Sequence, residues 1–171
     1  MEKEVLGQTA KYLQAGRLKM SQESNKVVIE LGGKKIAGFV CGTLHLVRSQ
    51  KAELEGRTNL EKCLTQHWLT YCTTDLFHCP TYEALNGCLQ YINTELANHS
   101  YLCGYTPTVA DIVMFLALHP FISKWTFLQK EQYMNISRWF GSMQNDDDLR
   151  KTYAPVQFSR TLLYEGTSRP H

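Results

Sequence analysis

Asp111 is the carboxylate with the most informative neighbours in this sequence. It stands three residues after Thr108 and directly before an apolar run that begins at Ile112. Such a carboxylate could act as a buried acid or base, but the Thr-x-x-Asp spacing also forms a capping box. In that motif the Thr hydroxyl accepts from the third helical N–H, and the Asp side chain accepts from the N–H of the Thr. The pattern favours a structural role at the start of a helix.

The cysteines and histidines suggest a zinc site that their spacing does not support. His67, Cys72, His78 and Cys79 are near one another in the sequence. Structural zinc sites, however, pair their ligands two to four residues apart in two separate knuckles, and no Cys-x-x-Cys occurs. We expect no metal site. The six cysteines should be reduced and mostly packed as small apolar residues: Cys41, Cys63, Cys72, Cys79, Cys88 and Cys103.

Other constellations that carry chemistry are missing from the sequence. It contains no glycine-rich phosphate loop, no Gly-x-Ser-x-Gly and no His-Glu-x-x-His. His45, His67 and His119 stand on or beside apolar faces of predicted helices, where a hydrogen-bonded core or surface histidine is the commoner outcome. We therefore predict no catalytic residue and no cofactor.

The composition is that of an ordinary globular protein. The 171 residues are 43% hydrophobic and 20% charged, with a net charge of +2, which excludes disordered and fibrous classes. The Lys and Arg residues are scattered, so the concentrated basic face that nucleic-acid binding requires is not expected. The sequence shows no secretory signal and no apolar run long enough to span a membrane. We expect a cytoplasmic protein with no membrane partner.

The first part of the chain combines strand and helix patterns. Residues 2–15 carry apolar side chains three and four apart, which indicates an amphipathic helix. Residues 26–31 are rich in β-branched side chains and predict a strand, with a short partner strand at 34–36. Residues 36–47 then predict a second helix, which runs into a polar segment.

The chain after this polar segment has only helical patterns. Thr58 and Glu61 form a second capping box, which opens a helix. Its inward face is predicted to consist of Leu60, Leu64, Trp68 and Tyr71.

Further helix starts follow along the chain. Thr81 is predicted to cap the next helix, and the helix after Thr108 is apolar nearly all round, as expected of a helix buried on every side. Asn135 is interpreted as an N-cap, and Asp146 to Asp148 as the cap of a short last helix.

The order of these parts resembles the architecture of glutathione transferases (GSTs), together with the motif Gly-x-x-x-Thr-x-Ala-Asp-Ile that ends at Ile112. The segments YLCGYTPTVADI, ALHPFI and YMNISRWF are similar to the scaffold proteins of the elongation factor 1 epsilon type, a GST-like, non-enzymatic family that interacts with the aminoacyl-tRNA synthetase complex. The likeness is good over residues 60–165 and loose before them. It implies an α+β, mostly helical fold.

The resemblance also implies a division into parts. A reduced thioredoxin-like subdomain would occupy residues 1–50 and a linker 51–57. An all-helical domain like the C-terminal domain of GSTs would occupy 58–160, followed by a tail at 161–171.

The residues that glutathione chemistry requires are not in place. A GST would need a proline in the cis form before its third strand, and Asn25 to Val28 contain none. A cis bond without proline costs about 2.5 to 4 kcal/mol. A Glu-Ser or Gln-Ser pair should open the next helix, but Lys35 to Gly38 stand there, and Glu23-Ser24 precede the strand. We predict that the chain is not an enzyme.

Arg138 is the residue most expected to bind a partner. It falls on the third position of the helix predicted after Asn135, where the helix dipole disfavours a cation by about 0.3 to 1 kcal/mol. In related GST-like domains of synthetase complexes, the matching arginine lies on a helix that pairs with its counterpart. The resemblance thus implies partner binding by Arg138 and its neighbour Ser137. The alternative is an exposed arginine whose stem covers apolar surface.

The resemblance implies a second surface on the helices at residues 36–50 and 58–76, the usual pairing surface of GSTs. Two surfaces would make the chain a bridge between GST-like domains of aminoacyl-tRNA synthetases, of the methionyl and glutamyl-prolyl types, or of elongation factor 1 subunits. Such a scaffold would support translation without catalysis. A glutathione transferase-type enzyme and a tRNA- or DNA-binding adaptor are the alternatives, and the resemblance allows a nuclear as well as a cytoplasmic location.

Overall fold

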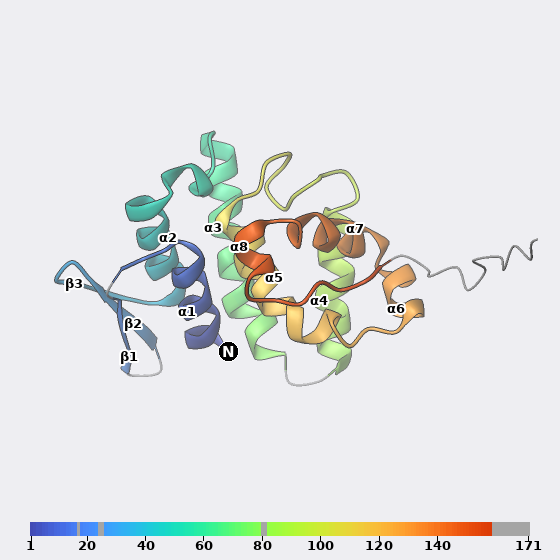
Figure 1. The fold of residues 1–171 in the computed structure, drawn as a ribbon, viewed down its shortest axis with the longest axis horizontal. Coiled ribbons are helices and arrows are strands. Elements are labelled where there is room, and N and C mark those ends of the chain that lie inside the picture. The colour runs from blue at the N-terminus through green and yellow to red at the C-terminus, as the bar shows by residue number, and fades with distance from the viewer. Residues whose placement is uncertain (17, 24–25, 80–81, 159–171) are drawn as a thin grey trace, which may run out of the picture.

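A computed structural model of the chain describes residues 1–16, 18–23, 26–79 and 82–158 (Figure 1). A small sheet with two helices is followed by a larger helical part. The elements are α1 (Glu2–Tyr12), β1 (Lys19–Glu23), β2 (Lys26–Leu31), β3 (Lys34–Ala37), α2 (Phe39–Gln50), the 3-10 turn η1 (Ala52–Glu55), α3 (Asn59–Thr74), the 3-10 turn η2 (Leu76–His78), α4 (Tyr82–Glu95), α5 (Val109–Ile122), α6 (Phe127–Gln132), α7 (Met134–Met143) and α8 (Asp147–Arg150).

The sheet is an antiparallel meander in the order β1-β2-β3. Its central strand β2 buries Val27, Val28 and Ile29, and Ile29 lies opposite Met20 of β1 and Ile36 of β3. The sequence predicted β2 and its short partner but not β1. The sequence of β1, KMSQE, has a single apolar residue, so its pairing with β2 decides its conformation. Figure 1 shows α1 between this sheet and the helical part.

The second helix begins later than predicted. Ile36 and Ala37 belong to β3, and α2 starts at Phe39 after Gly38. Gly38 has a φ of 96°, a value that glycine adopts readily and other residues rarely. This turn converts the strand into the helix and places the Phe39 side chain in the core.

Helix α5 is the centre of the helical part, as the sequence predicted. Its side chains from Val109 to Leu118 are all buried, because α1, α3 and α7 pack around it. The helix continues to Ile122 with Pro120 in its last turn. Among the described helices, none has the length and apolar character to cross a membrane.

Three other helix starts compare with their predictions as follows. The Thr58 hydroxyl accepts from the N–H of Glu61 at 3.1 Å, and the Glu61 carboxylate accepts from the N–H of Thr58 at 3.1 Å. The Asp146 carboxylate accepts from two N–H groups at the start of α8, which confirms that cap. The predicted cap at Thr81 and the predicted tail at 161–171 lie outside the described residues.

Candidate functional site

The buried carboxylate of Asp111 fastens three segments together. Oδ2 accepts from the N–H of Thr108, and Oδ1 accepts from the N–H of Leu102 and from the indole Nε1–H of Trp139, each at 2.9 Å. The Thr108 hydroxyl lies 3.1 Å from Oδ2. Burial raises the pKa of Asp111, and these hydrogen bonds, which favour the carboxylate, act in the opposite direction. The carboxylate has a structural task and positions α7 through Trp139.

The N-terminus of α7 is capped by a side chain from another helix. Oδ1 of Asn93, on α4, accepts from the backbone N–H of Asn135 at 3.0 Å and of Ile136 at 3.2 Å. The side-chain amide of Asn135 donates back to the Asn93 carbonyl at 2.9 Å. The predicted N-cap at Asn135 is therefore wrong. Because Asn93 satisfies these first N–H groups, α7 can begin at Met134.

Arg138 makes the reciprocal contact at the same, C-terminal end of α4. Its Nη2 donates to the carbonyl oxygens of Leu96 at 2.6 Å and His99 at 2.8 Å, which follow the last turn of α4. A cation that bonds to the last carbonyls of a helix stabilises the helix end. Since α7 starts at Met134, Arg138 lies beyond its first turn, and the predicted third position is wrong.

Arg138 nevertheless remains exposed, and its described hydrogen bonds all use Nη2. It stands one turn from Met134 and one turn from Ser142 on α7, and both of these residues are exposed. Met134 is 68% exposed and Tyr105 is 77% exposed. Tyr105 contacts the His99 ring, with ring centroids 6.3 Å apart.

We call the set Met134, Arg138, Ser142, His99 and Tyr105 the α7 surface. Methionine, arginine and tyrosine are enriched at protein interfaces relative to the rest of protein surfaces. The composition of the α7 surface therefore suits partner binding. The hydrogen bonds to the carbonyls of Leu96 and His99 hold the Arg138 guanidinium in a defined place.

Ser137 lies beside this surface but directs its hydroxyl into the chain. Its Oγ donates to the carbonyl of Lys130 at 2.9 Å and joins α6 to α7. Ser137 is half-buried, so a partner could reach it only in part. Its partner-binding role stays a prediction.

The second predicted surface, on α2 and α3, contains a leucine that was expected in the core. Leu60 is 69% exposed, which makes the predicted inward orientation wrong. It lies in the first turn of α3, which extends beyond the packed face that begins at Leu64. Cys63 and His67 are exposed on the same helix. An exposed leucine on this face is compatible with a contact region.

The positions for glutathione binding lack the required polar pair. Because Lys35 to Ala37 form part of β3, the residues that open α2 are Gly38 and Phe39 rather than the predicted segment. They line a hollow together with Val27 and Val40. Neither Gly38 nor Phe39 has a side chain that can donate a hydroxyl or offer a carboxylate to a γ-glutamyl group.

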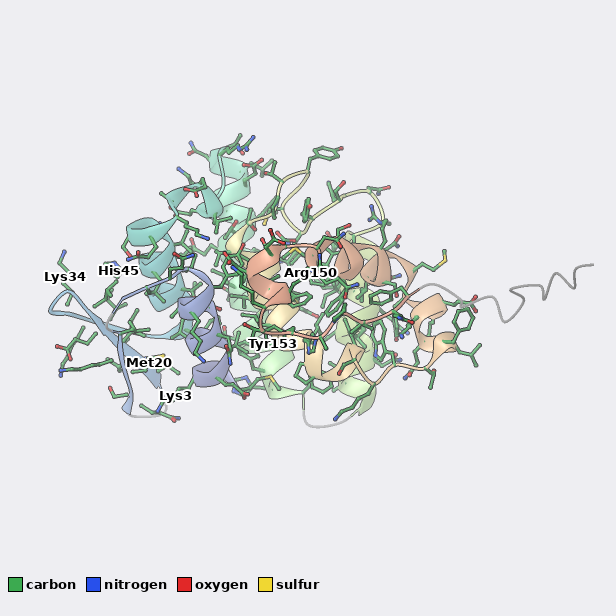
Figure 2. The ribbon with its side chains drawn as sticks, in the orientation of Figure 1. Lys3, Met20, Lys34, His45, Arg150 and Tyr153 are labelled. Atoms are coloured by element: carbon green, nitrogen blue, oxygen red, sulfur yellow. The ribbon has the colours of Figure 1, made fainter. Side chains whose placement is uncertain are left out.

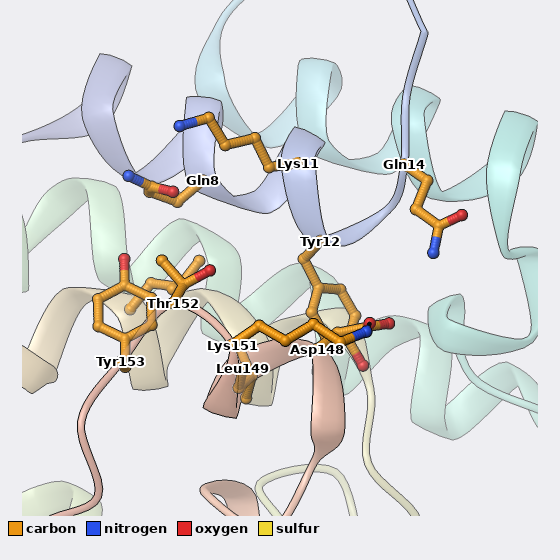
Figure 3. A pocket seen from close by; sticks show the side chains of 10 residues that line it. Gln8, Lys11, Tyr12, Gln14, Asp148, Leu149, Lys151, Thr152 and Tyr153 are labelled. Carbon is orange, nitrogen blue, oxygen red and sulfur yellow. Dashed lines mark hydrogen bonds and ion pairs between the residues drawn. The ribbon is translucent and has the colours of Figure 1, made fainter.

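A pocket between α1 and α8 is lined mostly by polar side chains, and two of its charged groups, Asp148 and Lys151, pair with each other (Figure 3). The Tyr12 hydroxyl donates to Asp146 at 3.0 Å, and Lys151 lies 2.9 Å from Asp148. Lys51 lies over the Tyr12 ring, 4.8 Å from its centroid. Burial and the Asp146 carboxylate raise the pKa of Tyr12. The contacts around this pocket thus connect α1 of the N-terminal part with α8 of the helical part.

The structure separates the residues of the imagined zinc site. Cys72 is buried, whereas His67 is exposed, and Nδ1 of His78 lies 2.7 Å from the carbonyl of Thr73. In the part of the chain that is described, no three His, Cys, Asp or Glu residues are grouped as metal ligands would be. Cys79 and Cys88 approach each other with sulfur atoms 3.5 Å apart, a contact that no spacing motif in the sequence marks.

Three of the described basic residues lie on different elements. Lys34 projects from the outer end of the sheet, Lys3 lies on α1 and Arg150 on α8 (Figure 2). Binding of nucleic acid through its backbone requires several cations along one surface. The described arrangement gives no such surface around these three residues.

Comparison with known proteins places similar chains in translation. A family model described as nuclear-export cofactor Arc1p matches residues 61–147. Eukaryotic translation elongation factor 1 epsilon-1 of Cricetulus griseus is 37% identical to this chain over 136 residues, which cover 79% of this chain and 78% of that protein.

Solved structures share most of this architecture. A glutathione S-transferase from Pichia kudriavzevii (Issatchenkia orientalis) matches with a TM-score of 0.68 and 20% identity, covering 88% of this chain and 89% of that chain. The GST-like domain of elongation factor 1-gamma from Saccharomyces cerevisiae matches with a TM-score of 0.64 and 16% identity, covering 92% and 91%. These matches confirm the predicted GST-like fold, which occurs in enzymes and in translation factors.

Proposed function

The chain belongs to the family of eukaryotic translation elongation factor 1 epsilon-1, and from this membership we propose that it is a non-catalytic adaptor of translation. It bridges GST-like domains of aminoacyl-tRNA synthetases, of the methionyl and glutamyl-prolyl types, in a multi-synthetase complex. Domains of elongation factor 1 subunits are partners of the same fold. We place this activity in the cytoplasm, with the nucleus as a second location.

The observation that carries the proposal is the α7 surface on a GST-like fold. Arg138 is held by two carbonyl oxygens through Nη2 and is exposed. A guanidinium has five N–H donors in a planar fork, so it can stack on or bond to a partner while it caps α4. Because the α4–α7 contacts order this side chain before binding, little of its conformational entropy is lost on association.

The presence of a second candidate surface favours a protein that bridges two partners over one that binds a single partner. The exposed face of α3 at Leu60, Cys63 and His67 and the α7 surface belong to different elements. An adaptor with two surfaces raises the effective concentration of one partner around the other, which strengthens an assembly without catalysis.

The same features weigh against an enzyme. Gly38 and Phe39 open α2 where a polar pair would hold glutathione, and the Tyr12 hydroxyl in the α1–α8 pocket donates to Asp146. The acidic group Asp111 is likewise used within the fold.

The primary test is affinity purification of the full-length chain from extract, followed by mass analysis of the proteins that co-elute. We expect aminoacyl-tRNA synthetases with GST-like domains. Recovery of no protein with a GST-like domain would contradict the proposal.

Two surface variants then assign the partners. Arg138→Ala should lose one GST-like partner and Leu60→Glu the other, because each changes a different surface. Lys124→Ala, at an exposed residue outside both surfaces, is the control. Since Arg138 also caps α4, the melting temperature of Arg138→Ala must be measured, and Arg138→Lys, which keeps the charge but not the fork, should bind the partner weakly while remaining folded. If all variants bound both partners as tightly as the wild type does, neither surface would be a binding site for these partners.

A further inference from the structure

Cys79 and Cys88 form a close pair of thiols outside both surfaces. Cys79 directly follows the turn η2, and Cys88 lies within α4, nine residues later in the chain. Their sulfur atoms are 3.5 Å apart, and both side chains are half-buried. Thiols of a folded protein at this separation need only a small movement to reach the bond length of about 2 Å in a disulfide.

The remaining cysteines are placed differently. Cys72 and Cys103 are buried, whereas Cys41 and Cys63 are exposed. Among the hydrogen bonds of the described residues, the 3.5 Å contact of Cys79 with Cys88 is the one that joins two sulfur atoms. The Cys79 thiol also donates to the carbonyl oxygen of Asp75, at the end of α3, at 3.3 Å.

We propose that Cys79 and Cys88 are a reversible redox pair, which forms an intramolecular disulfide by exchange with a low-molecular-weight disulfide such as oxidised glutathione. The inference goes beyond the adaptor function and does not depend on it. The pair has no catalytic role and is a modification site of the fold.

The reaction balances in two steps. A thiolate of the pair attacks one sulfur of glutathione disulfide, which breaks that S–S bond, releases one glutathione thiolate and leaves a mixed disulfide on the protein. The second cysteine, as its thiolate, then attacks the protein sulfur of this mixed disulfide and releases the second glutathione. The two protons of the protein thiols end on the two glutathione molecules. The protein is oxidised by two electrons and glutathione disulfide is reduced.

The surroundings of the pair determine the rate of this exchange. Burial and the neighbouring Cys88 raise the pKa of Cys79 to about 11. Because the thiolate is the nucleophile, oxidation should be slow at neutral pH and faster at higher pH. Such a pair responds to sustained oxidation, whereas brief exposure leaves it reduced.

The disulfide would act on an aromatic cluster between α3 and α4. Burial and hydrogen bonding to Cys88 raise the pKa of Tyr71, so this phenol and thiol are partners. The Tyr71 ring lies 5.6 Å from Trp68 and 5.2 Å from Tyr91, between ring centroids. Oxidation removes the S–H of Cys88 and thereby changes the environment of Tyr71 beside the exposed Tyr91.

The test uses the full chain with Cys41→Ser and Cys63→Ser, which removes the two exposed thiols and leaves four of the six cysteines. The protein is equilibrated with reduced and oxidised glutathione at about pH 8, unfolded in denaturant and alkylated with a maleimide. Intact mass should show four alkyl groups on the reduced form. The oxidised form should carry two, with the loss of two hydrogen atoms and no bound glutathione.

The position of the bond is read by peptide mapping. Glu83 lies between the two cysteines, so cleavage after glutamate separates the peptides that carry Cys79 and Cys88 unless a disulfide joins them. In this background, Cys79→Ser and Cys88→Ser should each lose the intramolecular bond. Their remaining thiol should either retain a glutathione adduct or be alkylated.

Three outcomes would overturn the proposal: four alkyl groups under oxidising conditions, a persistent glutathione adduct on the pair, or a crosslink that involves Cys72 or Cys103. A circular dichroism spectrum of each serine variant verifies that it is folded. If one variant does not fold, the peptide map of the parent protein still decides.

Discussion

Single residues in this protein perform structural tasks that connect distant segments. Asp111 accepts hydrogen bonds from Leu102, Thr108 and Trp139, so one carboxylate unites a loop, the start of α5 and the middle of α7. Arg138 bonds to the end of α4 and is also the exposed centre of the α7 surface. A residue with both tasks cannot be assigned to folding or to binding by its exposure alone.

Replacing Asp111 with asparagine should destabilise the fold. The side-chain NH₂ of asparagine would face N–H groups that now donate to the Asp111 carboxylate. Each buried donor that is left unsatisfied costs about 1 to 3 kcal/mol. We expect the free energy of unfolding in urea to fall by about 2 to 4 kcal/mol. Glu53→Gln, an exposed carboxylate on η1, is the control and should change it little. If Asp111→Asn were as stable as the wild type, the hydrogen bonds to Asp111 would not contribute to the stability of the fold.

His119 should make stability depend on pH. Burial lowers its pKa in the folded state, and its Nε2 is buried without a hydrogen-bond partner among the described residues. As the pH falls through the ordinary histidine value of about 6.5, the unfolded chain binds a proton that the folded chain does not. Stability is therefore full above this value and falls below it.

The measurement is urea unfolding at several pH values between neutral and about pH 5, for the wild type and for His119→Phe. The wild type should lose more stability than the variant over this interval. His45→Phe, which changes a half-buried histidine on α2, is the comparison. Parallel curves for wild type and His119→Phe would contradict the prediction.

At the scale of elements, α4 and α7 cap each other. Asn93 of α4 accepts from the first N–H groups of α7, and Arg138 of α7 donates to the carbonyls after α4. Each helix therefore completes the hydrogen bonding of the other, and the pair should behave as one unit. The α7 surface depends on this unit because both helices contribute residues or carbonyls to it.

Asn93→Ala should lower the free energy of unfolding by about 1 to 2 kcal/mol, the typical cost of losing an N-cap. It should also weaken binding to the partner of the α7 surface, since α7 loses its fixed start. Hydrogen exchange should increase at the N–H groups of Asn135 and Ile136. Gln90→Ala, an exposed change on the same helix, should alter none of these quantities. Unchanged exchange at both groups in Asn93→Ala would contradict the capping role.

The whole molecule shares its architecture with GST enzymes and its family with a translation factor. The two parts meet at α1, where the Tyr12 hydroxyl donates to Asp146 at the start of α8. The fold is similar to that of a glutathione S-transferase over 88% of this chain. The opening of α2 offers Gly38 and Phe39 to any ligand at that position.

Glutathione chemistry should therefore be absent from the purified protein. We expect no retention on immobilised glutathione and no turnover of an electrophile at high protein concentration, because no polar pair opens α2. An active glutathione transferase in the same assay is the positive control. Conjugation that rises in proportion to the protein concentration would contradict the prediction.

The features that could be predicted from the sequence are those whose interacting residues lie close together in the chain. The capping pairs of Thr58 with Glu61 and of Thr108 with Asp111, the strand at β2 and the buried α5 rest on residues close together in the chain. Their side-chain spacing is set by the helix or strand period itself. The GST-like fold and the translation family were also accessible, because several such local motifs occur in a fixed order.

Contacts between distant segments were decided only by the tertiary structure. The polar strand β1 exists through its pairing with β2, α7 starts where Asn93 of α4 caps it, and Leu60 is exposed because its turn extends past the packed face. The approach of Cys79 to Cys88 carries no sequence motif. Sequence by itself determined the elements and the family, since local periodicity and capping act along the chain. Packing between elements, which brings together residues far apart in sequence, decided which side chains remain available to a partner.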